Sequence, residues 1–204
     1  MAVGKIGVGN MADGAYPKRI SAGGAEIVVR EMRGADEKDM LDFARSLPTH
    51  DLLFVRRDIT NPKVVAAWVE AIRAGTIWSV LALRGEEIVG CAALIRDPLS
   101  WSPHVGEMRV LVAESARAQG LGRILIEECF RKALRLNMKK LVAQMTVDQK
   151  GAIAIFEELG FRGEALLKDH VIDRDGRAHD IVILSLDVAR AGAQLAAFGV
   201  GEAG

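Results

Sequence analysis

Two glycines and an arginine, spaced as R-x-x-G-x-G, stand immediately before an apolar run with helical spacing. The stretch from Glu114 to Glu128 reads ESARAQGLGRILIEE and contains Arg117, Gly120 and Gly122. A turn of this kind at the start of a helix presents backbone amides to an anion, and the helix dipole adds to the attraction. The spacing therefore favours a binding site for a pyrophosphate.

Two better-known phosphate-binding motifs do not fit this stretch. A Walker loop needs Lys and then Ser or Thr after its last glycine, but Arg123 and Ile124 follow Gly122. A dinucleotide fingerprint needs a third small residue three positions after Gly122, where Leu125 stands, and an acidic residue after the next strand. Six residues alone are also compatible with a turn that only redirects the chain, because glycine is common in turns.

The elements around this turn are predicted from apolar spacing and turn residues. These predict strands at residues 26–32, 76–83, 87–95, 105–112 and 140–146, and two more around the turn Asp173–Gly176. They also predict a helix ending at Pro48, a helix that begins at Asn61-Pro62 and ends at Gly75, and helices at residues 121–136 and 150–159. Strands in hairpins followed by strands alternating with helices indicate an α/β (α+β mixed) fold. We expect one mixed sheet of six to seven strands flanked by about four helices.

The chain is expected to form a single domain at residues 26–188. Its 204 residues are half apolar, which is enough for one buried core. Residues 1–25 and 189–204 are rich in Gly and Ala without a period, and we expect both segments to be mobile.

Charge and cysteine content narrow the possible partners. The 27 basic and 27 acidic residues cancel, so no overall field attracts nucleic acid or an anionic membrane, and we expect neither as a partner. Cys91 and Cys129 lie in apolar runs, which favours free thiols and a cytoplasmic location.

The four histidines show no metal-ligand spacing, so no metal site is predicted. Charged runs such as Arg56-Arg57-Asp58 are typical of solvated surface.

A second motif follows the first, separated from it by one predicted helix and one predicted strand. Residues 149–161 read QKGAIAIFEELGF, a helix with an apolar face and Gly160 at its end. Strand, RAQGLG, helix, strand, AIAIFEELGF and strand together closely resemble the GCN5-related N-acetyltransferase (GNAT) superfamily. The resemblance covers about residues 26–188 and is strongest from Glu107 to Phe161.

The resemblance implies a fold, an activity and a cosubstrate. The sheet would be splayed at the strand 105–112, and the chain would move an acetyl group from acetyl-CoA to a primary amine of an unidentified acceptor by direct attack. The glycines would let the pyrophosphate approach the backbone amides. The cofactor-binding residues that the resemblance implies are Val110, Leu111, Val112, Arg117, Ala118, Gln119, Gly120, Leu121, Gly122, Arg123, Gln149 and Phe156.

Catalytic residues are less completely matched. Glu107 lies where related enzymes often carry a carboxylate that deprotonates the amine, and its alternative role is a structural ion pair beside Arg109. Gln149 and Phe156 stand where the family usually carries Asn and Tyr, and that Tyr often protonates the leaving thiolate. The chain's one tyrosine, Tyr16, falls in the segment expected to be mobile.

The missing phenol leaves a second hypothesis open. The chain would then be a catalytically weak or inactive acyl-CoA-binding or interaction module. The late strands offer a sheet edge at which a homodimer could form.

Overall fold

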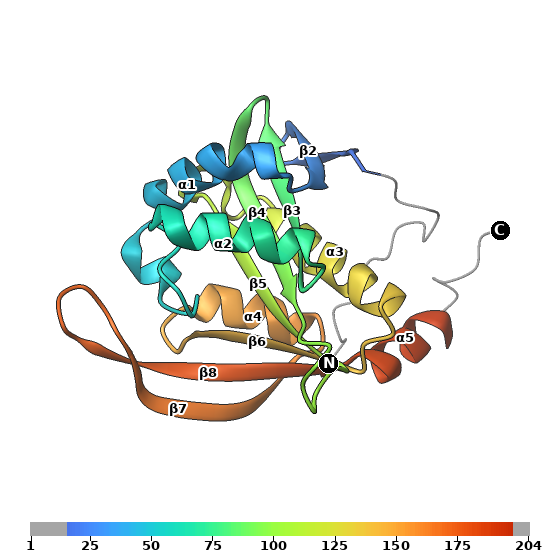
Figure 1. The fold of residues 1–204 in the computed structure, drawn as a ribbon. Coiled ribbons are helices and arrows are strands. Elements are labelled where there is room, and N and C mark those ends of the chain that lie inside the picture. Colours follow the sequence, from blue (N-terminus) through green and yellow to red (C-terminus); the bar gives the residue numbers. More distant parts are fainter. Residues whose placement is uncertain (1–15, 198–204) are drawn as a thin grey trace.

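A computed structural model describes residues 16–197, which form one mixed sheet with helices on both faces (Figure 1). The strands stand in the order β1-β2-β3-β4-β5-β6-β8-β7. Their bounds are β1 (Lys18–Ala22), β2 (Ala25–Glu31), β3 (Ile77–Arg84), β4 (Glu87–Ile95), β5 (Val105–Val112), β6 (Lys140–Thr146), β7 (Arg162–Ile172) and β8 (Ala178–Asp187). Neighbours pair antiparallel except β5 and β6, which are parallel. The mixed α/β fold is confirmed, with eight strands in place of the expected six to seven.

Within residues 16–197, five α-helices flank the sheet. They are α1 (Glu37–Ser46), α2 (Pro62–Arg73), α3 (Leu121–Arg135), α4 (Lys150–Glu158) and α5 (Val188–Ala197). Local sequence explains the start of α2, where the Asn61 side chain accepts a hydrogen bond from the Lys63 amide at 3.0 Å and Pro62 follows the cap. In Figure 1, α1 and α2 cover one face of the sheet and α3 lies on the other.

The buried apolar residues form two clusters, one for each face of the sheet. Residues of α1, α2 and the loop between them pack on β3 and β4 in the smaller cluster, which includes Met40, Val65 and Leu81. The larger cluster joins α3, α4 and α5 to the sheet through residues such as Leu125 and Phe161. The sheet is therefore held from both sides, and the strands that carry the site residues are fixed.

The sheet is splayed between its two parallel strands. Pairing of β5 with β6 runs from Val105 with Lys140 to Met108 with Ala143 and goes no further. The second half of β5 still pairs with β4, and the second half of β6 still pairs with β8. Each strand therefore has backbone groups that face the gap. The expected splay at residues 105–112 is confirmed.

The sheet begins before the expected domain start at residue 26. β1 pairs with β2 through a turn at Gly23 and Gly24, both of which have positive φ. Five residues with Ile20 and Ala22 as their apolar positions give little periodic signal, and the two turn glycines look like part of the Gly-rich leader. The rest of the segment expected to be mobile, residues 1–15, lies outside the described residues.

The sheet region is also followed by more structure than expected. Residues 188–197 form α5, which packs through Val188 and Ala191 on the core that α3 shares, whereas the sequence predicts a mobile segment from residue 189. Small residues without strong apolar spacing explain the difference, because packing against α3 supplies what local propensity does not. Residues 198–204 lie outside the described part. Within residues 16–197, no helix has the length and apolar character to cross a bilayer.

Candidate active site

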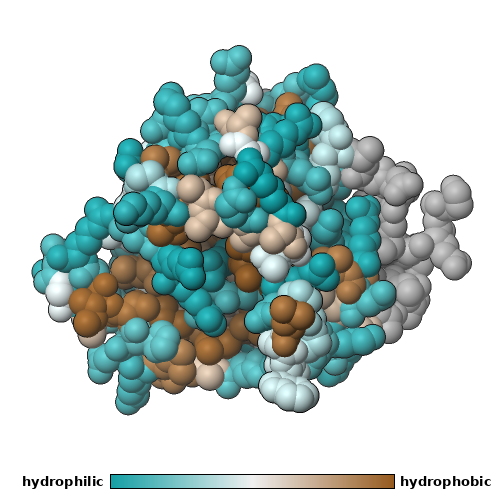
Figure 2. Space-filling model, in the orientation of Figure 1, coloured by the Kyte–Doolittle hydropathy of each residue, from teal (hydrophilic) through white to brown (hydrophobic). Residues whose placement is uncertain are grey.

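A cavity of about 800 Å³ occupies the gap between β5 and β6. Its walls come from the second half of β5, the turn after β5, the end of β6, α4, and the loop that follows α1. Figure 2 shows this side of the molecule, with apolar atoms gathered between the α1–α2 layer and the β7–β8 hairpin. Residues from elements far apart in the sequence therefore line one site.

The turn after β5 has the conformation that the R-x-x-G-x-G spacing predicts. Gly120 is the residue before α3 and has φ +82°, and Ala118 is also left-handed at φ 57°. Left-handed backbone is costly for a residue with a Cβ, so such a position marks a constrained turn. The first amide of α3 with a bond across this turn is that of Ile124, which donates to the Gly120 carbonyl at 3.2 Å. The amides before it lie at the helix N-terminus and have no intrahelical acceptor.

Crowding within the protein does not explain why positions 120 and 122 are glycines. A Cβ built on Gly120 meets nothing within 4 Å, and a Cβ built on Gly122 meets only Val112 Cγ2 at 3.9 Å. Gly120 has a backbone reason to be glycine, because its φ is positive. Gly122 has no such reason, so neither its backbone conformation nor its neighbours in the protein require glycine at this position.

Gln149 supplies a second sign that the cavity fits a polar ligand. Its side-chain Oε1 is buried and has no hydrogen-bond partner among the described residues, and Gln149 lines the cavity at the start of α4. A buried acceptor without a partner is costly. An amide N–H of a bound ligand, such as those of pantetheine, would satisfy it. Gln149 therefore offers an unused amide oxygen at the position where the family usually has Asn.

We call residues 117–123 the phosphate turn, after the ligand that their sequence predicts. Its two arginines, Arg117 and Arg123, lie at the cavity and form ion pairs. Arg117 donates from Nε to the Val112 carbonyl at 3.2 Å and from NH2 to Asp51 Oδ2 at 2.5 Å. Arg123 donates to Glu158 of α4. Both guanidiniums are therefore held at the rim of the cavity by residues from other elements.

Ten of the twelve residues expected to bind the cofactor line this cavity. They are Val110, Leu111, Val112, Arg117, Ala118, Gly120, Gly122, Arg123, Gln149 and Phe156. Gln119 and Leu121 do not line it. The Gln119 side chain donates to the Ser115 carbonyl and accepts from Arg84, and Leu121 is 1% exposed in the core. The side chains of these two residues are therefore used within the protein, away from the cavity.

A second cavity of about 520 Å³ lies between α2 and strands β3 to β5. Leu111 lines both cavities, so they adjoin along β5. Glu107 lines the second cavity, and Arg109 holds its Oε1 with Nε at 2.8 Å and NH2 at 2.7 Å. Arg56 Nε lies 3.5 Å from the other oxygen, Oε2. Glu107 thus forms the predicted ion pair with Arg109, and it also lines a cavity.

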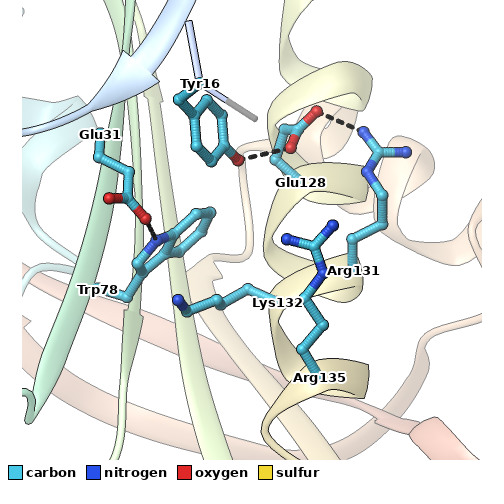
Figure 3. Close-up of a pocket in the computed structure, with 7 residues that line it drawn as sticks. All are labelled: Tyr16, Glu31, Trp78, Glu128, Arg131, Lys132 and Arg135. Carbon is cyan, nitrogen blue, oxygen red and sulfur yellow. Dashed lines mark hydrogen bonds and ion pairs between the residues drawn. The ribbon is translucent and has the colours of Figure 1, made fainter. Parts of the chain in front are cut away.

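No tyrosine lines either cavity in the described residues. Phe156 is 6% exposed and makes an edge-to-face contact with Phe161, with ring centroids 4.9 Å apart. Tyr16 is placed by the structure after all, but it lies beside α3 and donates from its phenol to Glu128 at 2.6 Å (Figure 3). Burial and the Glu128 carboxylate raise the pKa of Tyr16 well above its usual range. Tyr16 therefore does not replace the family's phenol.

Two pairs of histidine and aspartate were not anticipated from the sequence. His50 Nε2 lies 2.8 Å from Asp148 Oδ2, and His179 Nε2 lies 2.7 Å from Asp173 Oδ2. A hydrogen bond from Thr146 and the nearby histidines hold the pKa of Asp148 below its usual range. His50 and Asp148 come from segments far apart in the chain, so no local spacing could have revealed their contact. Asp173 and His179 are six residues apart and meet across the turn between β7 and β8. Within residues 16–197, no group of three or more His, Cys, Asp and Glu residues could hold a metal ion.

The arrangement of splayed sheet and phosphate turn agrees with a family model for the acetyltransferase (GNAT) family, which matches residues 41–161. The chain belongs to this family. The family expected from the two sequence motifs is therefore confirmed, and with it the class of acetyltransferases. The matched region runs from α1 through Phe161 and so contains both cavities' principal walls.

Individual GNAT proteins resemble the chain at low identity. A protein of Bacillus subtilis (strain 168), provisionally named phosphinothricin acetyltransferase YwnH, is 28% identical over 83 residues. That match covers 41% of this chain and half of the relative's length. An N-acetyltransferase from Staphylococcus aureus Mu50 superposes with a TM-score of 0.70 at 15% identity, covering 79% of this chain and 98% of that one.

A third protein carries a ligand in its solved structure. It is a phosphinothricin acetyltransferase from Sinorhizobium meliloti in complex with acetyl-CoA, with a TM-score of 0.67 at 18% identity. The superposition covers 79% of this chain and 88% of that one. At these identities the likeness shows that the GNAT fold is shared.

Proposed function

We propose that this GNAT protein transfers an acetyl group from acetyl-CoA to a primary amine. The observation that carries the proposal is that the splay at Met108 opens onto the phosphate turn, with an unfilled space at Gly122. An adjoining cavity shares Leu111 with this site and provides room for an acceptor. The Sinorhizobium relative with bound acetyl-CoA supports the choice of donor.

The chain's residues would bind the donor along β5. Backbone groups near Val110 and Val112 face the gap left by the splay and would pair with pantetheine as a neighbouring strand does. The amides from Leu121 to Arg123 would hold the pyrophosphate at the start of α3, and the unpartnered Gln149 Oε1 would accept from a ligand amide. The thioester supplies the acetyl group, which leaves sulfur for the attacking nitrogen.

Glu107 is proposed as the general base. An amine in the second cavity arrives mostly as an ammonium ion and must lose a proton before its nitrogen can form the new C–N bond. Glu107 is only 17% exposed, and Arg109 fixes its Oε1 through two contacts. Its Oε2, with the looser contact to Arg56, is the oxygen left to accept that proton, directly or through water.

The thiolate released when the C–S bond breaks also needs a proton. Phe156 lines the donor cavity but has none to give, and Tyr16 is bonded to Glu128 beside α3. We propose that water in the connected cavities returns the proton. This route makes leaving-group protonation a candidate for the slow step, since a positioned acid is absent from the described residues.

Release of coenzyme A in the presence of amines tests this function. Acetyl-CoA binding is first measured by calorimetry, and thiol release is then followed with a panel of amines. The function predicts binding of the donor and sustained, amine-dependent turnover. Donor binding without turnover on any amine would support the second candidate, an acyl-CoA-binding module, for which the observation is Phe156 at the place of the usual acid.

A homodimer is proposed through the free edge of β7. β7 ends the strand order and is exposed along most of its 11 residues, including Leu166 and Ile172 at 52% and 68% exposure. Such an edge offers unpaired backbone groups to another strand. Light scattering of the intact protein tests this, and a monomer at micromolar concentration would contradict it.

A further inference from the structure

The charged residues of the second cavity are mostly cationic. Four arginines line it, against two carboxylates, and the rest of the lining is largely apolar. The charged members are Arg56, Arg57, Arg96, Arg109, Asp97 and Glu107. The chain as a whole has no net charge, so the excess is a property of this cavity rather than of the surface in general.

Two of these arginines have no carboxylate partner. Within the described part of the chain, Arg57 is exposed and forms no hydrogen bond or ion pair, and Arg96 donates only from Nε, to the Gly75 carbonyl at 3.2 Å. Arg109 and Arg56, by contrast, are committed to Glu107. The cationic excess therefore comes from groups that are free to meet an anion.

The two carboxylates have other partners. Glu107 is held between Arg109 and Arg56, and Asp97 accepts a hydrogen bond from the Leu99 amide at 3.0 Å in its own turn. An acceptor with several ammonium groups would need several unpaired carboxylates to replace its hydration, and it would also face Arg57 and Arg96. The cavity is therefore poorly suited to a polyamine or to a Lys-rich peptide.

The cavity suits a different kind of amine. We propose that the acceptor is a small primary amine that also carries an anionic group, a carboxylate or a phosphonate, and an apolar body. This inference rests on the proposed function, because it assigns the acceptor to the cavity beside the donor site. The amine lies toward Glu107 and the anion toward Arg57 and Arg96, while Trp68 and Ile95 provide apolar wall. Arginine is well matched to such anions because its planar fork can donate twice.

Matched acceptors separate the contribution of the anion from that of the apolar body. L-Leucine, L-leucinamide and 3-methylbutylamine share one side chain, as do L-phenylalanine and phenethylamine, and 2-aminoethylphosphonate and spermidine extend the range of charge. We expect kcat/KM for the anionic members to exceed that of their uncharged or cationic counterparts by about tenfold or more. The amide is a stringent comparison, because its amine is less protonated at pH 8 and more of it is ready to attack.

Arginine variants test the residues themselves. Arg57→Gln and Arg96→Gln should each raise KM for the best anionic acceptor by about tenfold, while kcat changes by less than about twofold. Neither variant should change KM for the matched uncharged amine. Arg190→Gln, on the exposed side of α5, is the control and should leave every constant unchanged. The effect of Arg57 and Arg96 on KM should also shrink at high salt.

Each outcome has a defined meaning. If acetyl-CoA binds and only amines without an anion are acetylated, or if both arginine variants keep the KM of the anionic acceptor, the acceptor class is wrong and the transferase function stands. If acetyl-CoA does not bind, or if no amine in the panel is turned over, the proposed function fails and the acceptor class fails with it. Selective turnover of the anionic amines that depends on Arg57 and Arg96 supports both.

Discussion

Arg117 of the phosphate turn and Asp51 of the loop after α1 are joined by an ion pair, with NH2 2.5 Å from Oδ2. The carboxylate is 21% exposed, and both residues line the donor cavity. The pair therefore ties the α1–α2 loop to the turn that would hold a pyrophosphate. It also places a negative charge at the rim of a site for an anion.

Asp51→Asn keeps the shape of this contact and removes the charge. We expect the affinity for coenzyme A to rise by about threefold to tenfold at low salt, because a repulsive charge near the phosphates is lost. Calorimetric titration measures the change, and the gain should diminish in about 0.5 M salt as screening increases. A large loss of affinity would instead mean that holding Arg117 in place matters more than the repulsion.

Gly122→Ala separates the needs of the fold from those of the ligand. The new Cβ meets only Val112 at 3.9 Å, and alanine favours a helix, so stability should be unchanged or higher by about 0.5 kcal/mol. Coenzyme A affinity should nevertheless fall at least tenfold, since the methyl group occupies the approach to the amides. Gly163→Ala, on β7 and also in open space, is the control that should leave affinity unaltered. Equal affinity in the Gly122 variant would remove the pyrophosphate from this turn.

Glu107→Gln tests the proposed base. The substitution keeps size and removes the proton acceptor, so kcat at neutral pH should fall by about a hundredfold while donor affinity changes little. The acidic limb of the pH–rate profile should flatten in the variant. Glu70→Gln, an exposed carboxylate of α2, should behave as the unaltered protein. A full rate in the Glu107 variant would place the base elsewhere.

Phe156→Tyr tests whether protonation of the thiolate limits the rate. The ring is almost fully buried beside Phe161 and lines the donor cavity, so an added hydroxyl enters the site with little change in packing. We expect kcat to rise about tenfold, within the range for general-acid assistance, and the melting temperature to stay the same. A lower melting temperature with unchanged turnover would show that Phe156 only packs the core and that water already suffices.

The carboxylate of Glu128 should make stability depend on acid pH. Burial alone would raise its pKa, but hydrogen bonds from Lys18, Tyr16 and Arg131 outweigh burial and hold the pKa below the ordinary value of 4.5. Figure 3 shows the contacts of Glu128 with Tyr16 and Arg131. A lowered folded-state pKa gives stability that is complete above 4.5 and is lost as the pH falls through the folded value. Glu128→Gln should cost about 3 kcal/mol at pH 7, because two partly buried cations, Lys18 and Arg131, lose their anionic partner. In urea unfolding this difference should shrink below about pH 4, and a constant difference would contradict the assignment.

Local sequence was a good guide where periodicity and flanking turns agree. The bounds of β5 and β6 match the predicted residues 105–112 and 140–146, and α2 begins at the predicted Asn61-Pro62 signal. Most residues predicted to bind the donor line one cavity because the turn that carries them is continuous in sequence. A predicted residue does not line the cavity where its side chain points elsewhere, as that of Gln119 does toward Arg84.

The acceptor cavity could not be predicted in the same way. Arg56 and Arg57 look like a solvated run in the sequence, and only the packing of the α1–α2 loop against β5 brings them to a cavity. The pairing of His50 with Asp148 likewise joins residues almost a hundred positions apart. Such contacts form only in the tertiary structure, and they leave no periodic pattern in a single sequence.

The end of β5–β6 pairing at Met108 and Ala143 has a consequence for dynamics. Backbone amides that face the gap lack a strand partner, so in the free protein their hydrogens should exchange with solvent faster than those of the paired halves. A bound pantetheine would complete the ladder, and exchange should then slow along residues 109–112 and 144–146 while β3 and β4 stay as they were. The donor would thus act as a removable strand of the sheet. The free energy of local opening at β5 and β6 would therefore rise with donor concentration.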